Sequence, residues 1–529
     1  MATLGEALVA GLEAYGIRTV FGIPGVHTVE LYRGLATSGI AHVTPRHEQG
    51  AGFMADGYYR ATGRVAAAFV ITGPGLTNIL TPMAQAYADS IPMLVVSSVN
   101  RRAVAGMGGD LHEIRNQSLI AAQAAAFSHQ ITHPDQLGPV LARAWAVFDG
   151  ARPCPVHIEV PLDLFAASEP AQAAARKTRV LRPELVVPRD TIRMLDDAAT
   201  PLILAGGGSI GADVSALAER LDAPVILTTN ARGVVAQGHP LSVPASPSLE
   251  AVRAQIAAAD VVLAIGTEIG RTDYDTYDRG GVDIPGALIR IDIDAEHMVR
   301  GAAPDVALLG DAASITGAIV GALAPARDRD GAARADAARA AAQDEIGAKY
   351  RAILGFLETL RDTMPDAPIV SDSTQAAYAG NLYYNALAPR RWFNASSGYG
   401  ALGYGLPAAI GAAKAKGGPV ICIVGDGGLQ FTLADLGTAV EEKLPVILLV
   451  WNNQGYAEIK DYMLSRQIRP VGVDLVTPDF VALGRAYGAE ALALEDIDDL
   501  PALLRQAAAR QGPTVIEIDE ALVIEPQAA

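Results

Sequence analysis

The chain has 529 residues, of which 50% are hydrophobic and only 5% aromatic, and its formal net charge is −17. At roughly 150 residues for each domain, this length predicts about three domains, and the composition favours an α/β protein. The negative charge argues against nucleic acid or an anionic membrane as a partner, and no apolar run approaches the roughly 18 residues that cross a bilayer.

The N-terminus and the two cysteines indicate the cellular compartment of the protein. Leu4, Leu8 and Leu12 recur at helical spacing, and no basic leader precedes them. Cys154 lies beside prolines and Cys422 lies inside an apolar strand, so we expect two packed thiols and neither a disulfide nor a metal pair. We therefore expect a cytoplasmic protein.

Residues 1–165 form the first predicted domain, in which strands alternate with helices. Each expected strand is apolar throughout, as in a parallel sheet whose two faces are both covered by helices. We therefore predict a doubly wound sheet with its glycine-rich strand ends on one edge. The expected strands and the turns that end them are 19–23 with Pro24-Gly25, 67–71 with Gly73-Pro74-Gly75, and 93–97.

Glu48 stands shortly before a helix that we expect at 53–62. A glutamate at such a place has a simple role, since a negative charge near a helix N-terminus favours the helix dipole. The alternative role is that of a catalytic carboxylate. His27 follows the first strand and Asn78 follows the second, so both are candidates at the same sheet edge.

A glycine-rich loop is expected at 101–117, and it carries His112, Glu113 and Gln117. A histidine in such a loop can act as an acid or base near neutral pH, or it can simply be solvated. We take His112 and Gln117 as catalytic candidates, and His27 and Glu113 as candidate substrate contacts.

Residues 166–189 are expected to be a linker because of their prolines, and residues 190–325 form a second α/β unit. Residues 206–211 satisfy the Gly-x-Gly-x-x-Gly pattern of a dinucleotide site after a strand. That site also needs an acid at the end of the next strand, where this chain has Asn230. We therefore do not expect NAD, and FAD remains possible but not favoured.

Four acids follow a later strand of this second unit. Most short acidic runs are solvated surface. If one or two of these carboxylates point inward, they suit a cationic substrate, best a guanidinium held by two contacts, and Asp273 is our candidate. The four acids are Glu268, Asp273, Asp275 and Asp278.

Residues 326–345, rich in Ala, Arg and Asp, are expected to be a mobile helical connector, and residues 346–529 form the last domain. Here one apolar strand runs into Asp426 and a later one runs into Asn453. Because parallel strands end on one sheet edge, the two side chains can meet there, and oxygen ligands of this kind suit Mg²⁺.

Gly425-Asp426-Gly427, followed one helix and one strand later by Asn452-Asn453, resembles the diphosphate-binding motif of thiamine-diphosphate (ThDP) enzymes. Segments 21–25, 47–51 and 73–78 together resemble the pyrimidine-binding domain of their acetolactate synthase-like branch. The resemblance implies a fold of three doubly wound α/β domains. They are a pyrimidine-binding domain (1–165), a Rossmann-like middle domain (190–325) and a diphosphate-binding domain (346–529).

The resemblance also implies roles for particular residues. Glu48 hydrogen-bonds N1′ of the cofactor's aminopyrimidine, the Gly400 carbonyl accepts from its 4′-amino group, and Leu402 supports the bent cofactor. Asp426, the Asn453 side chain and the Gly455 carbonyl hold Mg²⁺. The other cofactor-binding candidates are Pro24, Gly25, Asn78, Thr374, Gln375, Gly425, Gly427, Gly428 and Tyr456.

By the same resemblance, the enzyme decarboxylates a 2-oxo acid without oxidation and leaves an enamine, which takes a proton or a second carbonyl compound. The segments around His27, 111–113, 266–270 and 372–375 look most like 2-ketoarginine (5-guanidino-2-oxopentanoate) decarboxylases. Acetolactate synthases carry Phe-Gln-Glu where this chain has Leu111-His112-Glu113. Glu458 is a further substrate candidate.

Three alternatives remain open at this point. They are an acetolactate-forming carboligase, an FAD-linked 2-oxo acid oxidase and a non-catalytic ThDP-binding protein. Glu48 and Asp426 lie at opposite ends of the chain, yet both must touch one cofactor. In this family they do so across a subunit interface, which implies a homodimer or homotetramer.

Overall fold

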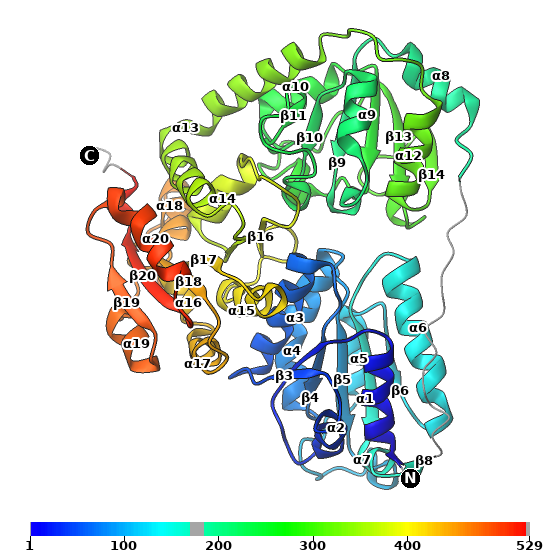
Figure 1. The fold of residues 1–529 in the computed structure, drawn as a ribbon, viewed down its shortest axis with the longest axis vertical. Helices are drawn as coiled ribbons and strands as arrows, with labels where there is room; N and C mark the ends of the chain where they lie inside the picture. Colours follow the sequence, from blue (N-terminus) through cyan, green and yellow to red (C-terminus); the bar gives the residue numbers. More distant parts are fainter. Residues whose placement is uncertain (1, 170–184, 525–529) are drawn as a thin grey trace.

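The computed structural model describes residues 2–169 and 185–524, and it confirms the predicted α/β class. Three six-stranded sheets, all of them parallel, are each flanked by helices (Figure 1). The middle domain lies at the top of this view, the first domain at the bottom and the last domain at the left. Among the described residues, no helix is long and apolar enough to cross a membrane.

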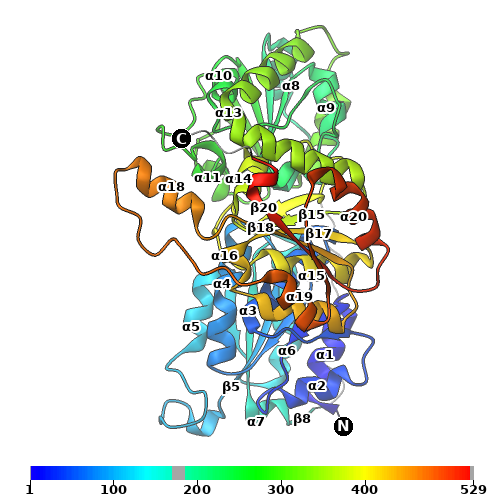
Figure 2. The ribbon, with the colours of Figure 1, turned by 90° about the vertical axis from the view of Figure 1, so that its left-hand side faces the viewer.

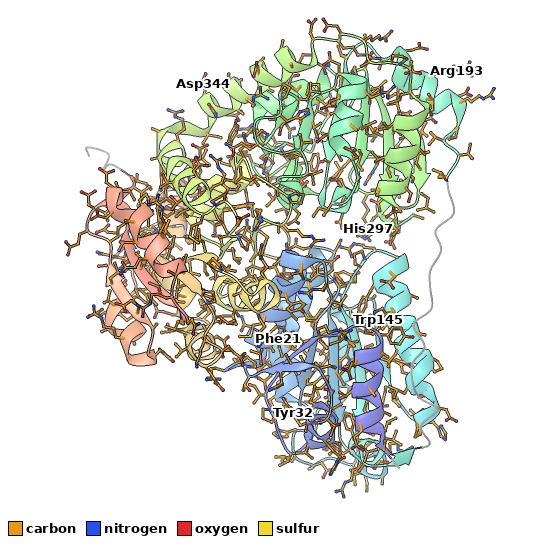
Figure 3. All side chains as sticks on the ribbon, in the orientation of Figure 1. Phe21, Tyr32, Trp145, Arg193, His297 and Asp344 are labelled. Atoms are coloured by element: carbon orange, nitrogen blue, oxygen red, sulfur yellow. The ribbon has the colours of Figure 1, made fainter. Side chains whose placement is uncertain are left out.

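The first domain has the strand order β3-β2-β4-β5-β7-β6. Phe21 is fully buried in its core (Figure 3). The helix expected at 53–62 begins five residues earlier, at Glu48. The strands are β2 (Thr19–Gly22), β3 (Ala41–Val43), β4 (Ala67–Val70), β5 (Leu94–Val99), β6 (Phe127–Gln130) and β7 (Val156–Pro161), and the helices are α1 (Leu4–Ala14), α2 (Val29–Leu35), α3 (Glu48–Thr62), α4 (Pro74–Ala88), α5 (Gln117–Ala121), α6 (Leu137–Gly150) and α7 (Leu162–Phe165).

The expected linker falls mostly outside the described residues. Its described start contains the short strand β8 (Ser168–Glu169), which pairs antiparallel with β1 (Ala2–Thr3). The Thr3 hydroxyl then caps α1, and the Glu6 carboxylate accepts in return from the Thr3 N–H, 2.7 Å away. The chain therefore leaves the first domain beside the point where it entered.

The middle domain has the strand order β11-β10-β9-β12-β13-β14. Strands β9, β10 and β12 are fully buried, which explains their apolar sequence, while the edge strand β14 is partly exposed. The strands are β9 (Pro201–Ala205), β10 (Val225–Leu227), β11 (Ser242–Val243), β12 (Val261–Ile265), β13 (Ala287–Asp292) and β14 (Val306–Leu309), and the helices are α8 (Arg189–Asp197), α9 (Val214–Leu221), α10 (Glu250–Ala257), α11 (Arg271–Tyr274) and α12 (Ala312–Ala322).

The connector differs from the expectation of a mobile segment. It is the first half of a long helix, α13 (Gly331–Thr363), which is interrupted at Gly347. Ala335, Ala338 and Ala342 of this half are buried in a core that the middle and last domains share. The alanines let the helix lie close to its neighbours, so the connector is a packed element.

The last domain has the strand order β16-β15-β17-β18-β20-β19. Neighbours β17 and β18 pair in register from Val420 with Val446 to Gly425 with Trp451. The strands are β15 (Ile369–Ser371), β16 (Trp392–Asn394), β17 (Val420–Gly425), β18 (Val446–Asn452), β19 (Glu490–Ala493) and β20 (Thr514–Asp519), and the helices are α14 (Gln375–Leu382), α15 (Gly405–Lys416), α16 (Asp426–Leu429), α17 (Leu436–Glu441), α18 (Ala457–Ser465), α19 (Phe480–Tyr487) and α20 (Leu500–Ala508).

Helices α3 and α15 join the first and last domains (Figure 1). Their backbones touch at two glycines, because a side chain on Gly57 or Gly411 would meet the carbonyl of the facing helix. A buried ion pair lies beside this contact, with Arg60 2.6 Å from Asp56 and 2.5 Å from Asp89. These three charged residues belong to the first domain, and the Tyr404 hydroxyl of the last domain donates to Asp56 at 2.6 Å, so the ion pair is tied to both domains.

Candidate active site

Asp426 is the buried centre of the turn after β17. It is only 1% exposed, and its Oδ2 atom accepts a hydrogen bond from the Thr477 hydroxyl at 3.3 Å. Its Oδ1 atom has no hydrogen-bond partner within the part of the chain that the structure describes. Burial raises the pKa of Asp426, against the opposing effect of nearby backbone N–H groups such as that of Asn453. A buried, unpaired carboxylate oxygen of this kind is ready for a cation.

Asn453 leaves the neighbouring strand at the same sheet edge. Its Nδ2 atom donates to Glu520 at 3.0 Å, and Glu520 also accepts from the Trp451 indole at 2.9 Å. Because the nitrogen is held in this way, Oδ1 is the side of the amide that can ligate a metal. Gly455 is fixed nearby by an antiparallel bridge to Asp474. The predicted ligands thus offer oxygen atoms from one turn region, which suits Mg²⁺.

The glycines of the 425–428 turn lie against two predicted cofactor contacts. A Cβ atom on Gly427 would lie 2.6 Å from the Tyr456 ring, and one on Gly425 would lie 3.4 Å from the Thr374 hydroxyl. Thr374 caps α14 and is followed by Gln375. The 374–375 and 425–428 turns therefore adjoin, as a diphosphate cradle requires.

Gly400 and Leu402 lie in a segment that is tied to the first domain. The Ala401 N–H donates to Gln85 at 3.2 Å, and the Ser397 hydroxyl lies 3.1 Å from the Asp89 carboxylate. Gly400 is exposed and Leu402 is half-buried. The segment is therefore held in place before any ligand arrives.

Glu48 and Asn78 meet at the carboxyl edge of the first sheet. The Asn78 Nδ2 atom donates to the Glu48 carboxylate at 2.9 Å. Glu48 follows β3 and Asn78 follows β4, while Pro24 and Gly25 follow β2, which lies between these strands. The sheet order thus gathers four residues that are far apart in the sequence.

His27 and His112 also meet at this edge. Their rings contact edge to face with centroids 5.2 Å apart, and His27 Nδ1 lies 3.1 Å from the Thr72 hydroxyl. Burial lowers the pKa of His27, the neighbouring His112 lowers it further and Asp110 opposes the change. Asp110 is a neighbour that we did not predict, because its contact depends on how the loop folds.

Gln117 is buried, and its polar atoms are engaged inside the domain. Its Nε2 atom donates to the Ser98 carbonyl at 2.6 Å, and its Oε1 atom accepts from the Gly73 N–H at 3.1 Å. These contacts hold the 106–117 loop on the turn after β4, which is a positioning role. Glu113 accepts from the N–H groups of Gly108 and Asp110 and so closes its own loop.

The two halves of the candidate site do not touch within one chain. Among the described residues, no hydrogen bond or ion pair joins Glu48 or Asn78 to the 425–428 or 452–456 turns.

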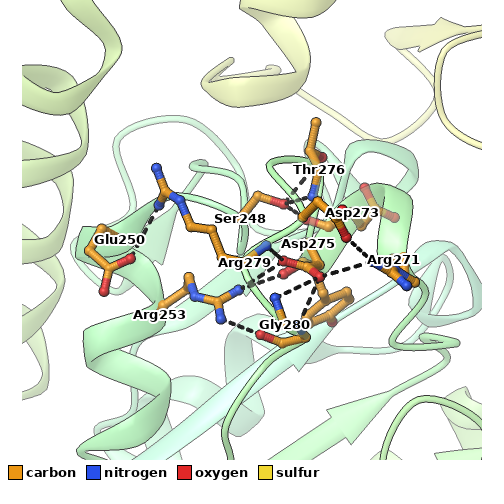
Figure 4. A network of polar contacts seen from close by, with 12 residues as sticks. Ser248, Glu250, Arg253, Arg271, Asp273, Asp275, Thr276, Arg279 and Gly280 are labelled. Carbon is orange, nitrogen blue, oxygen red and sulfur yellow. Dashed lines mark hydrogen bonds and ion pairs between the residues drawn. The ribbon is translucent and has the colours of Figure 1, made fainter.

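In the acidic run of the middle domain, carboxylates form hydrogen bonds and ion pairs with other groups of the protein (Figure 4). Asp275 accepts from the N–H groups of Arg279, at 2.7 Å, and Gly281, at 2.8 Å, and these hydrogen bonds lower its pKa. Asp278 pairs with Arg271 on the surface. These two carboxylates stabilise the loop and leave no free acceptor for a substrate.

Glu268 and Asp273 have internal partners as well. Glu268 lies 3.0 Å from Arg152. Asp273 accepts from the Thr229 N–H at 3.4 Å, and burial raises its pKa to about 6, against the nearby charge of Arg232. Glu268 and Asp273 also line the cavity between the first and middle domains, and a substrate contact at Asp273 stays a prediction.

A cavity of about 690 Å³ lies where the middle domain faces the first domain, with His297 on its wall (Figure 3). Arg60, Arg152 and Arg300 line this cavity, but each is already paired with an acid of the protein. Gly206 and Gly208 pack directly on the turn around Gly266. These glycines therefore pack on the Gly266 turn and also line the cavity.

Glu458 lies at the start of α18, two residues after Tyr456. It is half-buried, it accepts from the Tyr350 hydroxyl at 3.3 Å, and the Gln375 amide, which also faces Glu520 and Lys349, lies 3.3 Å away. Of the acids proposed as substrate contacts, Glu458 is the one beside the Asp426 edge.

Comparisons with known proteins agree with this geometry. Domain models of thiamine pyrophosphate (that is, ThDP) enzymes match residues 2–120 (N-terminal TPP binding domain), 189–319 (central domain) and 372–518 (C-terminal TPP binding domain). A probable 2-ketoarginine decarboxylase of Pseudomonas aeruginosa is 45% identical over 98% of this chain and 94% of its own length.

More distant relatives are named for a different activity. The large subunit of acetolactate synthase isozyme 3 of Escherichia coli is 30% identical over 95% of this chain and 91% of its own. An acetolactate synthase of Arthrospira platensis is 28% identical over 97% and 93%. The similarity to all three proteins extends through the three domains.

Proposed function

The chain belongs to the thiamine pyrophosphate enzymes, and from this premise we propose that it is a ThDP- and Mg²⁺-dependent decarboxylase that prefers 5-guanidino-2-oxopentanoate. The observation that carries the cofactor assignment is the buried Asp426 Oδ1 atom, which is unpaired beside the Asn453 amide. The substrate assignment rests on the 45% identity to a probable 2-ketoarginine decarboxylase.

Each half of the site has a role in holding the cofactor. When bound, ThDP supplies the nucleophilic carbon and the electron sink for loss of CO₂. Asp426, Asn453 and the Gly455 carbonyl would hold Mg²⁺, and the 425–428 and 374–375 turns would face the diphosphate. Glu48 would bind the aminopyrimidine N1′, with Asn78 keeping its carboxylate in place.

The last step of a decarboxylase is delivery of a proton to the reacting carbon. His27 and His112 are the donors that we propose, because their rings are in contact at the strand-end edge of the first domain and imidazole can transfer a proton near neutral pH. A carboligase instead needs room for a second carbonyl compound at this place. The acetolactate synthases are less similar, at 28–30% identity.

We propose that the active sites form between two subunits, in a homodimer or a pair of dimers in the cytoplasm. Glu48 and Asp426 make no contact within one chain. Apolar side chains are exposed near both halves, with Leu119 64% and Phe431 53% exposed. Subunit contact would bury such surface.

Mixing two inactive variants tests the shared site. Glu48→Gln and Asp426→Asn proteins, after subunit exchange, form mixed dimers with one site in which both residues are intact. We expect recovery of up to roughly a quarter of wild-type activity. No recovery, with exchange verified by mass-tagged subunits, would place each site within one chain.

The substrate assignment is tested by CO₂ release from protein loaded with ThDP and Mg²⁺, over pyruvate and branched, aromatic and guanidino 2-oxo acids. We expect the guanidino acid to be preferred, with an aldehyde product and no activity in Glu48→Gln. Release from pyruvate with formation of acetolactate would assign a carboligase. A flavin absorption band in the purified protein would favour the oxidase.

A further inference from the structure

Glu458 is a half-buried carboxylate without a cation. Its hydrogen bond from the Tyr350 hydroxyl is long at 3.3 Å, and a carboxylate can accept about four. It forms no ion pair with a Lys or Arg of the described residues, and the nearby cations are engaged elsewhere. Arg279 pairs with Glu250 and Glu345, and Lys349 pairs with Asp461.

The Tyr350 hydroxyl contacts this carboxylate, and the Glu458 charge also acts on two tyrosines from other elements. Tyr277 comes from the loop after α11, Tyr350 from α13 and Tyr378 from α14. Burial raises the pKa of Tyr378 to about 12, and the Glu458 charge adds to that rise, as it does at Tyr350 and Tyr277. Figure 2 shows α11, α14 and α18 on the same side of the molecule. We call these four residues the Glu458 box.

The Glu458 box adjoins the candidate cofactor site. The Gln375 amide lies 3.3 Å from Glu458, and Gln375 follows Thr374, whose hydroxyl lies against Gly425. Tyr456, two residues before Glu458, packs its ring on Gly427. A substrate that reacts at this edge can therefore extend its tail toward Glu458.

We infer that the Glu458 box binds the guanidinium tail of the substrate and so sets the preference for a cationic 2-oxo acid. This inference rests on the proposed decarboxylase function. A carboxylate accepts the two parallel N–H groups of a guanidinium, and tyrosine rings attract the flat cation to their faces. A neutral tail would leave the half-buried Glu458 charge without compensation.

The acidic run of the middle domain does not have these properties. Asp275, Asp278 and Glu268 are paired with arginines, and Asp273 lies near Arg232. Tyr277 of the same loop is influenced by the Glu458 charge, and the Arg279 guanidinium lies over its ring, 4.8 Å from the centroid.

The deciding experiment compares two 2-oxo acids of equal length, one with a guanidino tail and one with a neutral ureido tail of similar shape. We expect Glu458→Gln to lower kcat/KM for the guanidino acid by about 100-fold, as loss of a charge-assisted pair does. The value for the ureido acid should change by less than about threefold. Glu495→Gln, at an exposed carboxylate of the same domain, is the control and should alter neither.

A second variant and a binding measurement distinguish a loss of substrate recognition from a folding defect. Tyr277 is 45% exposed, so Tyr277→Leu should fold, and it should lower kcat/KM for the guanidino acid alone, by about fivefold. Calorimetry with an unreactive guanidinoalkanoate should give about tenfold weaker binding in Glu458→Gln.

The outcomes separate the inference from the proposed function. If the wild type prefers the guanidino acid and Glu458→Gln keeps that preference, the box is not the recognition site while the function stands. If the wild type releases CO₂ from pyruvate alone, the proposed substrate and the box both fail.

Discussion

Two glycine-rich turns of this protein look alike in sequence and differ in what surrounds them. Residues 206–211 follow β9 of the middle domain, and residues 425–428 follow β17 of the last domain. In the first turn, the glycines lie on the backbone around Gly266, and the Ser209 hydroxyl donates to Gly206 at 2.7 Å. In the second turn, Asp426 keeps a buried oxygen atom without a partner among the described residues.

The comparison separates a packing motif from a ligand site. Glycines allow close approach of any group, whether that group is backbone or phosphate. Only the second turn leaves a buried polar atom that a bound ion would satisfy. We therefore expect the ligand at the 425–428 turn, and the following predictions test that difference.

The largest effect is expected from Asp426→Asn, which removes the charge and keeps the shape. ThDP and Mg²⁺ binding, measured by calorimetry, should become too weak to detect, and CO₂ release should fall by at least about 1,000-fold. Ser209→Ala in the middle turn is the matched control and should leave both unchanged. Cofactor affinity within threefold of wild type in the Asp426 variant would remove the distinction between the turns.

Glu520→Gln should weaken Mg²⁺ binding by about 10–100-fold, as loss of a residue that orients a ligand does. The reason is that Glu520 holds the Asn453 nitrogen and so directs Oδ1 toward the metal. Titration of the protein with Mg²⁺ at fixed ThDP measures the shift. Glu517→Gln, which frees only Asn452, is the control, and an equal effect in both variants would argue against the orienting role.

Two glycine substitutions, one in each turn, should affect different properties, namely stability and cofactor affinity. Gly206→Ala forces a methyl group onto the Gly266 turn and should destabilise the protein by about 1–3 kcal/mol in denaturant unfolding, with cofactor affinity unchanged. Gly427→Ala meets the Tyr456 ring and should reduce cofactor affinity. Reduced cofactor affinity in Gly206→Ala would make the middle turn part of a ligand site.

The smallest expected effect is a pH dependence of the unliganded protein. Asp372, 1% exposed behind the 425–428 turn, has a pKa raised to about 6 by burial, with the N–H groups of Gly405 and Ser373 opposing. The folded state therefore binds this proton more tightly than the unfolded state, in which the pKa is about 3.9. Its stabilisation is complete below pH 4 and is lost as pH rises through 6.

Asp372→Asn should remove this slope, so the free energy of unfolding of the wild type should fall relative to the variant by on the order of 2 kcal/mol between pH 4 and 7. The pH dependence of stability that Asp260 of the middle domain contributes has the opposite sign. Hydrogen bonds from Ala199 and Thr200 lower its pKa against burial, so its contribution is lost as pH falls. Equal slopes in the two Asn variants would contradict the assignment.

Some of the site could be predicted from the sequence because parallel sheets obey a simple rule. Strand ends share one edge, so Asp426 and Asn453 could be placed together, as could Glu48 and Asn78. The start of α3 could not be predicted, because Gly50 and Gly52 disfavour a helix by propensity. In the fold both glycines are buried, and they let Asp435 and Pro82 approach closely.

The sequence by itself determined the α/β class, the three domains and which candidate residues share a strand-end edge, since strand pattern and motif spacing are local properties. Only the tertiary structure decided which acids are available. Asp275 and Glu268 are paired by residues that the acidic pattern does not include. Among the described residues, Glu458 remains without a paired cation and accepts from the Tyr350 hydroxyl of a distant segment, because side-chain pairing depends on packing.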